Sequence, residues 1–396
     1  MITIRPVILT LFCCFAAAGL LANTPTHPLT VVALGDAGNR GAILRGNAGL
    51  VTAMTTGEHD AGVPDVLLFL GCDFGETGLN VPASDVDGEV NGTLGFFRDV
   101  IARLGRSNVH GIPGETEYYS HRAVETTALF GLVSLSKWPI GVSDRGVARA
   151  GERREWTYHG HYPSSAVYPT NDGTSDSVQF VFMDTGILMR TKPATWFPVL
   201  DSLRRLLSAT RNRPGIRWHL LCSHHPLVSY GEHGGYTQWN EDDSTVSAVT
   251  GCDKDTNAFR FVHNWLDPED LCTDRYQAYI DSVGSILASS GVEFQAQLSS
   301  HDLSLQLIDR NPAHGNPHVQ IISGCGSAAG LARIGPYSSA RKENEGVSLP
   351  GIVQLRWQEG SLLVTFFGER NGEKLDMGTG ATVFRIDGRG TMTEVR

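Results

Sequence analysis

Residues 222–226 read CSHHP and follow a short apolar run at residues 218–222, which is typical of a buried strand. Two further stretches have the same form: LGDAG at residues 34–38 and SHDL at residues 300–303 each follow an apolar run. The ends of buried strands are the places where α/β folds hold ligands and catalytic groups. These stretches therefore predict an α/β fold with a site built from carboxylate and imidazole side chains at the strand ends.

Apolar runs alternate with helical patterns over most of the chain. We expect strands at residues 29–34, 66–70, 109–112, 178–183, 218–222, 292–298 and 319–322, and helices at residues 96–104, 196–207 and 276–288. The later apolar runs are joined by turn signals, and they predict an antiparallel meander that completes a second sheet, with strands at residues 352–357, 362–367 and 381–386. Alternation of this kind is typical of helices packed on sheets.

The chain shows no change of composition that would mark a linker. Residues 28–396 are therefore predicted to form one domain, with a polar surface insertion at residues 234–274. The formal net charge of −10 argues against nucleic acid as a partner, because nucleic acid is bound through basic patches. A protein partner stays open, but the sequence does not say which protein it is.

Residues 1–22 have the composition of a secretory signal peptide. Arg5 precedes an apolar stretch at residues 7–21, and small residues up to Ala22 offer cleavage sites. The alternative is an uncleaved anchor, although the stretch is short for a membrane span. With the signal removed we expect no membrane span. The protein is then expected in the secretory pathway, either secreted or held in an endomembrane or lysosome-like compartment.

Cysteine usage agrees with export. The cysteines that remain after the signal are odd in number: Cys72, Cys222, Cys252, Cys272 and Cys325. Cys252 and Cys272 flank one polar segment and form the best candidate disulfide. Asn91 begins a glycosylation sequon, which is the pattern expected of an exported glycoprotein.

Taken singly, each candidate site residue has an ordinary structural explanation. Asp36 could cap the turn that follows it, and His224 or His301 could be a hydrogen-bonded structural histidine. The order of the stretches is more specific: GDAG at 35–38, GCDFGETG at 71–78, GETE at 114–117, SHHP at 223–226 and SHDL at 300–303. In this order they resemble the sequence blocks of the calcineurin-like metallophosphatases, most closely the purple, tartrate-resistant acid phosphatase branch.

The resemblance covers about residues 30–390 apart from the insertion. It implies a four-layer α/β/β/α sandwich, in which two mixed sheets are flanked by helices. It also implies a two-metal centre, and here the chain departs from the family. Asp36, His224 and His301 keep the expected residues. The bridging Asp falls on Cys72, the Asn ligand on Glu115, the tyrosinate ligand on Gly75 and the last His ligand on Leu303.

These departures predict at most one metal ion. By the resemblance, Cys72, Glu115, His224 and His301 form a set that suits zinc, with iron or manganese as alternatives, whereas the other site retains only Asp36 among its unshared ligands. The alternative is that Cys72 is a buried thiol, Glu115 forms a salt bridge and no metal binds. The histidine that assists phosphate binding or leaving-group protonation in the family falls on Thr116, so no catalytic residue is assigned.

Two functions remain open at this point. The first is a phosphatase-like protein that has lost or strongly reduced hydrolysis and serves a binding or structural role. The second is an atypical hydrolase of phosphomonoesters that uses one metal ion. The loss of imidazole at Thr116 favours the first function, because general acid catalysis typically contributes about 10²–10⁴-fold to rate.

Overall fold

The computed structural model describes residues 27–38, 42–59, 62–73, 95–118, 157–160, 162–229, 233, 270–310, 316–324, 326–327, 345–347, 350–370, 373–375 and 383–395. Several expectations fall outside these ranges and are not tested by the structure. They concern the signal peptide at residues 1–22, the sequon at Asn91, Gly75, Cys252 and most of the insertion. Cys272 is disulfide-bonded, while Cys72 and Cys222 are free and buried.

The described strands form two mixed sheets. The first has the order β16-β15-β13-β12-β1-β2-β3-β4, with β14 paired to β13. Its strands are β1 (Thr30–Leu34), β2 (Val66–Phe69), β3 (Val109–Gly111), β4 (Thr157–Tyr158), β12 (Gly351–Gln358), β13 (Ser361–Arg370), β14 (Glu373–Leu375), β15 (Val383–Asp387) and β16 (Met392–Val395).

The second sheet has the order β11-β9-β10-β8-β7-β6-β5. Its strands are β5 (Ser164–Pro169), β6 (Ser177–Met183), β7 (Ile216–Ser223), β8 (Ala296–Ser299), β9 (Leu305–Asp309), β10 (Val319–Ser323) and β11 (Glu345–Val347). Neighbours β6, β7, β8 and β10 are parallel, so their carboxyl ends lie along one edge of the sheet.

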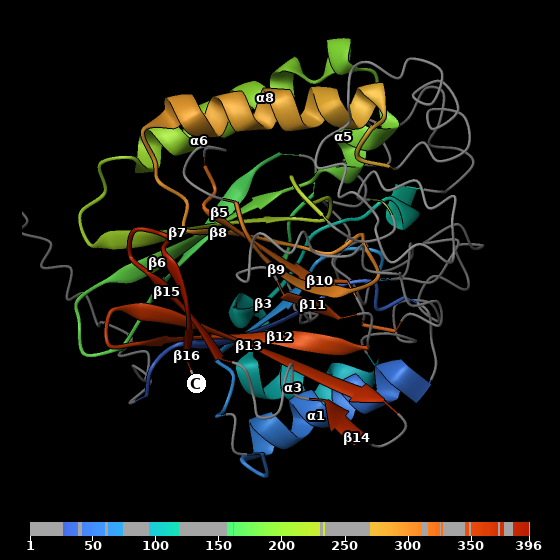
Figure 1. Ribbon diagram of the computed structural model, residues 1–396, viewed down its shortest axis with the longest axis vertical. Coiled ribbons are helices and arrows are strands. Elements are labelled where there is room, and N and C mark those ends of the chain that lie inside the picture. The colour runs from blue at the N-terminus through green and yellow to red at the C-terminus, as the bar shows by residue number, and fades with distance from the viewer. Residues whose placement is uncertain are drawn as a thin grey trace, which may run out of the picture.

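Helices cover the outer face of each sheet. Figure 1 shows α6 (Phe197–Thr210) and α8 (Asp274–Ser290) above the second sheet, and α1 (Ala42–Thr56) and α3 (Arg98–Leu104) below the first. The remaining helical turns are short: η1 (Gly95–Phe97), η2 (Arg106–Asn108), η3 (Thr116–Tyr118), α5 (Gly186–Arg190) and η5 (Pro193–Thr195). The α/β/β/α sandwich expected from the sequence is confirmed.

Strand β1 shows why this arrangement forms. Successive strand side chains point to opposite faces, and all five residues of β1 are buried. Val31 and Ala33 lie in the core between the two sheets, together with Trp218 and Trp357. Val32 and Leu34 lie in a second core beneath α1 and α3. A third core, beneath α5, α6 and α8, completes the packing.

The carboxyl-terminal meander differs from the expectation in one respect. Strands β12, β13 and β15 are antiparallel neighbours as predicted, but they extend the sheet that contains the first strand of the chain. Strand β12 pairs antiparallel with β1, and Val31 lies opposite Leu355. The reason is that both strands contribute apolar side chains to the core between the sheets.

Two further differences concern helix α1 and the membrane question. Helix α1 was not predicted, and its sequence contains two glycines, Gly46 and Gly49, which lower the helical propensity of the segment. Among the residues that the structure describes, no helix is both long and apolar enough to cross a membrane.

Candidate metal centre

The site lies where the carboxyl ends of strands from both sheets meet. Strands β1, β2 and β3 are parallel neighbours, and Asp36, Cys72 and Glu115 follow them in that order. From the second sheet, His224 follows β7 and His301 follows β8. All five residues predicted as metal ligands from the sequence therefore lie at one edge of the sandwich, in loops that directly follow strands.

Several of these loops have an unusual backbone. Asp36, Cys72 and His301 have φ values of 54°, 56° and 69°, in the left-handed region that residues with a side chain seldom adopt. Gly71 has φ 98°, and a Cβ there would lie 2.6 Å from the backbone nitrogen of Gly114. The loops after β2 and β3 can approach this closely only because glycine is present. Backbone strain of this kind is found mainly at functional sites.

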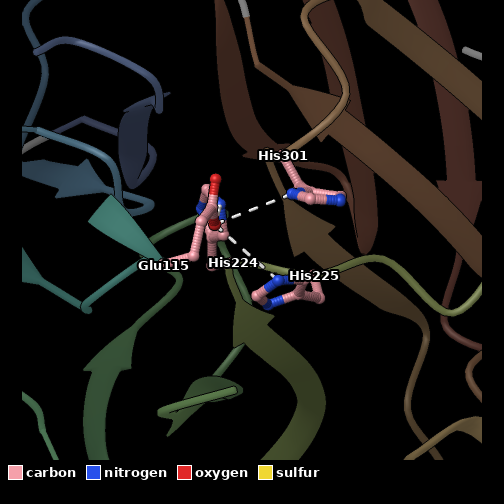
Figure 2. A group of neighbouring side chains, drawn as sticks. All are labelled: Glu115, His224, His225 and His301. Atoms are coloured by element: carbon pink, nitrogen blue, oxygen red, sulfur yellow. Dashed lines mark ion pairs between the residues drawn. The ribbon is translucent and has the colours of Figure 1, made fainter. Parts of the chain in front are cut away.

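Four buried side chains converge on one point (Figure 2). The Oε2 atom of Glu115 lies 2.5 Å from Nε2 of His224. It also lies 3.7 Å from Nε2 of His225 and 3.7 Å from Nδ1 of His301. The candidate ligand atoms of all four residues lie within 4.8 Å of one another. We call Glu115, His224, His225 and His301 the metal cluster.

The ring of His224 is oriented by its other nitrogen. Nδ1 lies 2.8 Å from the carbonyl oxygen of Leu70 and 2.7 Å from Oγ of Ser300. The hydroxyl of Ser300 donates its proton to the same carbonyl, so Nδ1 of His224 carries a proton of its own. Nε2 is left facing Glu115. This is the usual arrangement of a metal-ligating histidine, in which one nitrogen is anchored and the other is presented to the ion.

His225 supplies an independent test of whether an ion fits. Its Nδ1 lies 2.9 Å from Oγ1 of Thr185. Its Nε2 is buried and has no hydrogen-bond partner, although it faces the carboxylate of Glu115. Buried polar atoms are normally paired. An imidazole nitrogen without a hydrogen-bond partner next to a carboxylate therefore indicates that a further group binds between them.

The spacing of the cluster also suits one small cation. Neighbouring ligands around a tetrahedral zinc lie about 3.3 Å apart when the bonds are about 2 Å long. The two separations of 3.7 Å, from Glu115 to His225 and to His301, are close to this value. The shorter contact between Glu115 and His224 is an ion pair that an ion would replace. Three imidazoles and one carboxylate are a donor set that suits zinc, and also iron or manganese.

Charges in the cluster depend on the contact between Glu115 and His224. Burial raises the pKa of the Glu115 carboxyl, but the neighbouring His224 more than offsets it and holds this pKa well below its usual value. Burial likewise lowers the pKa of His224, and Glu115 raises it to about 9. For His225, burial and the nearby imidazoles hold the pKa well below its usual value. The cluster therefore holds a charged pair beside a neutral imidazole.

Asp36 and Cys72 form a second group with His224 rather than joining the cluster. The Sγ atom of Cys72 lies 3.3 Å from Nε2 of His224. Burial, with Glu115 next in effect, holds the pKa of the thiol well above its usual value. Burial raises the pKa of Asp36 to about 7. Cys72 is thus a neutral thiol when no ion is bound, and the candidate ligand atoms of Asp36, Cys72 and His224 also lie within 4.8 Å of one another.

Two further positions that the resemblance assigns to the site lack the expected side chain. Leu303, where the last histidine was expected, has an aliphatic side chain that cannot act as a ligand. Thr116 is partly exposed, and its hydroxyl donates to the carboxylate of Glu117 over 3.4 Å. No imidazole therefore stands at the expected acid–base position.

Glu117 stabilises the loops of the site without joining the cluster. Its carboxylate accepts backbone N–H groups from Cys72 at 3.0 Å, Asp73 at 2.8 Å and Gly114 at 2.7 Å. Sequence reasoning missed both Glu117 and His225. The histidine pair in CSHHP was the available signal for His225, because a strand that ends at Ser223 no longer forces neighbours to opposite faces.

Comparisons with known proteins support the fold and leave the family open. No protein-family model matches the chain, and no curated protein matches it. Among solved structures, GAP50, titled the anchor in the inner membrane complex of Plasmodium, aligns with a TM-score of 0.53 and 13% identity, covering 88% of this chain and 86% of GAP50. At this identity the likeness shows the fold alone.

Two further solved structures align more weakly. PhoD aligns with a TM-score of 0.49 and 8% identity, covering 93% of this chain and 72% of PhoD. Vacuolar Protein Sorting 29 from Cryptosporidium parvum aligns with a TM-score of 0.31 and 9% identity, covering 93% of this chain and 98% of its own. These two likenesses add nothing to the assignment.

Proposed function

We propose that this chain is a purple-acid-phosphatase-like protein whose two-metal centre has been reduced to one metal site. The observation that carries the proposal is the convergence of Glu115, His224, His225 and His301 on a single point. Asp36 lies beside this cluster. Leu303 has an aliphatic side chain, so it cannot join Asp36 as a metal ligand. The chain therefore presents the ligands of one complete site and the remnant of another.

The residues at this site favour binding over hydrolysis. A bound zinc or similar ion would supply a Lewis acid that polarises a phosphoryl oxygen. Thr116 takes the position at which an imidazole was expected to protonate a leaving group. Near neutral pH the Asp36 carboxyl is present in both its charged and its neutral form, since burial raises its pKa to about 7. We therefore propose that hydrolysis is lost or strongly reduced.

A binding or structural role follows from the same proposal. GAP50, which shares the fold, is named as an anchor, so this fold is compatible with a structural role. By this analogy the present chain would bind a protein partner through its surface. We further propose that residues 1–22 direct it to the secretory pathway. The disulfide bond of Cys272 supports this route, because disulfides persist in oxidising compartments.

The test is a metal count followed by an activity assay on the purified full chain. We expect about one zinc, iron or manganese ion per chain, lost in His224→Ala and retained in His219→Gln. His219 is a matched control because it lies on the same strand, β7, outside the cluster. Turnover of a phosphomonoester should not exceed that of His224→Ala. Two ions per chain would contradict the one-metal proposal.

The second candidate function is hydrolysis of phosphomonoesters with a single ion. The convergence of the four side chains of the metal cluster favours it, because an ion bound there would be a Lewis acid. In that case the one-ion protein should turn over substrate, and His224→Ala should abolish the turnover together with the ion. The same pair of measurements therefore separates the two candidates.

A further inference from the structure

A second group of histidines lies at the edge of the sandwich and takes no part in the proposed metal site. His110 belongs to β3, and His159 follows β4 directly. Their rings stack at 5.0 Å between centroids, and the ring of His159 lies 3.9 Å from that of Phe182 on β6. The two nitrogens that face each other, Nδ1 of His110 and Nε2 of His159, are 2.9 Å apart.

One backbone carbonyl fixes the direction of every hydrogen bond in this group. The hydroxyl of Tyr168 donates its single proton to the carbonyl of Ser107 at 2.7 Å. Its oxygen must then accept from Nε2 of His110, 2.6 Å away. Nδ1 of His110 is consequently bare and accepts from Nε2 of His159. Nδ1 of His159 in turn accepts from the hydroxyl of Ser164 at 2.6 Å.

This chain of hydrogen bonds, from Ser164 through His159 and His110 to Tyr168, joins the two sheets. His110 belongs to β3 of the first sheet, and His159 directly follows β4, at which the strand order of that sheet ends. Ser164 and Tyr168 belong to β5, which ends the strand order of the second sheet. In the described part of the molecule, this series of hydrogen bonds therefore links the two sheets along the edge at which β4 and β5 lie.

The surroundings favour the neutral form of both rings. The groups that face them are Tyr168 and Ser164 from β5, Phe182 from β6 and the carbonyl of Ser107 from η2. None of these is a carboxylate, and within the described ranges neither ring is paired with one. Burial lowers the pKa of His110 to about 4 and that of His159 to about 3, and it raises the pKa of Tyr168.

We propose that this hydrogen-bond chain is a pH-sensitive latch, which holds the β4–β5 edge closed while both histidines are neutral and releases it when either is protonated. A proton on Nδ1 of His110 would place two N–H donors face to face at 2.9 Å. A proton on Nδ1 of His159 would force the Ser164 hydroxyl to turn and would leave a charged ring without a carboxylate. Either change weakens the link between the sheets.

The latch is a property of the fold and does not depend on metal binding. Its strand, however, leads towards the metal cluster, because β3 ends at Gly111 and Glu115 follows four residues later. The latch thus gives the protein a response to acid compartments in addition to its proposed binding role. Opening would expose the backbone amides of β4 and β5, whereas those of β1 and β7, at the centres of the sheets, would stay protected.

Hydrogen–deuterium exchange of the full chain tests the latch directly. After correction for the intrinsic pH dependence of amide exchange, protection at residues 157–169 should fall at least about tenfold from pH 7.5 to about pH 4.5. Protection of β7 should change less than about threefold. Equal loss in β5 and β7 would mean global acid unfolding and would overturn the proposal, as would unchanged protection of β5.

The matched variant is His110→Gln with His159→Gln, which keeps polar side chains but removes both titrating rings. Its protection at β5 should respond to acid less than about threefold. His318→Gln is the control, since this histidine pairs with exposed Glu293 at 2.9 Å, outside the latch, and it should respond as the unmodified chain does. A double variant as acid-sensitive as the unmodified chain would overturn the proposal.

A second measurement needs no substitution. Nitrogen NMR of the histidine rings at pH 7.5 should show both His110 and His159 with the proton on Nε2, as the carbonyl of Ser107 dictates. Either ring found charged near pH 6, or protonated on Nδ1 alone, would overturn the proposal.

Discussion

The part of the molecule that the structure describes contains two groups of histidines that differ in charge. The three rings of the metal cluster and His110 are buried, and His159 is half-buried. In the metal cluster, Glu115 raises the pKa of His224 to about 9 against the effect of burial. In the latch, burial acts unopposed and lowers the pKa of His110 to about 4. The difference lies in the carboxylates that face His224, Glu115 first and Asp36 second. A buried histidine is charged or neutral according to whether such a group lies within reach.

The same difference decides what each group can bind. Around Glu115 the nitrogens of three rings lie near one carboxylate oxygen. A cation can therefore take the place of the proton in the ion pair between Glu115 and His224. In the latch, each nitrogen of His110 and His159 already has a single donor or acceptor, and the two rings face each other directly. Only the first group offers a place for an ion, and only the second is complete without one.

The largest expected effect comes from removing Glu115, the carboxylate whose presence distinguishes the metal cluster from the latch. Glu115→Gln should lower zinc affinity by more than about 100-fold, since a charged ligand is lost from the cluster. The pKa of His224 should fall from about 9, because the largest effect that opposes burial is then removed and only the weaker effect of Asp36 remains. Isothermal titration with zinc and NMR titration of the ring measure the two effects.

Glu293→Gln is the matched control for this substitution, because it removes a carboxylate from an exposed histidine pair. It should leave zinc affinity unchanged. A Glu115→Gln protein in which His224 stays charged at pH 8 would contradict the role given to the carboxylate.

The second effect is the pH dependence of stability from the latch. The folded pKa of His110 lies below its ordinary 6.5, so the unfolded chain binds the proton more readily. Its contribution to stability is complete above about pH 6.5 and is lost as the pH falls towards about 4. From pH 7 to pH 5 the free energy of unfolding should fall by about 2 kcal/mol through His110 alone.

Urea unfolding at a series of pH values measures this loss. His110→Gln should flatten the acid side of the profile, and His318→Gln should leave it as it is. His224 acts in the opposite direction: its folded pKa is raised, so its contribution is complete below about pH 6.5 and is lost as the pH rises through about 9. A loss of stability from pH 7 to pH 5 that is no larger than that of His110→Gln would disprove the assignment of the latch.

A smaller effect distinguishes the two candidates for the fourth position of the cluster. His225→Gln should weaken zinc binding about tenfold or more, because it removes the nitrogen that faces Glu115. Cys72→Ser should change it less than about threefold, since the thiol lies in the neighbouring group with Asp36. Competition with a chromophoric chelator measures both affinities. The reverse order would restore the ligand set predicted from the sequence.

The smallest effect concerns the end of the latch. Ser164→Ala removes the hydroxyl that donates to Nδ1 of His159 at 2.6 Å. The free energy of unfolding at pH 7.5 should fall by about 1 kcal/mol, the typical contribution of one hydrogen bond. Ser289→Ala is a control on exposed helix surface and should have less effect. Equal losses in the two variants would count against the latch.

The sequence predicted the fold and the strand ends because both have local signals. Runs of apolar residues marked β1, β2, β3, β6 and β7, and the polar residues after β1, β3 and β7 marked Asp36, Glu115 and His224. His225 was missed as a member of the cluster because its role depends on how the chain turns after Ser223. The sequence pattern does not record that turn.

The latch had no local signal at all. His110 lies 49 residues from His159 and 58 from Tyr168, and none of the three lies in a recognisable motif. Only the approach of the two sheet edges brings them together. The pairing of the meander with β1 was unresolved for a similar reason, since either sheet could have accepted its apolar strands.

Glu117 has a consequence for how this site can change. Its carboxylate accepts hydrogen bonds from the amides of Cys72, Asp73 and Gly114, so the loops after β2 and β3 are held together by contacts that need no cation. Side chains on these loops can then be exchanged while the loops keep their conformation. The conformation of the site and its reactivity are separate properties, and one can persist after the other has gone.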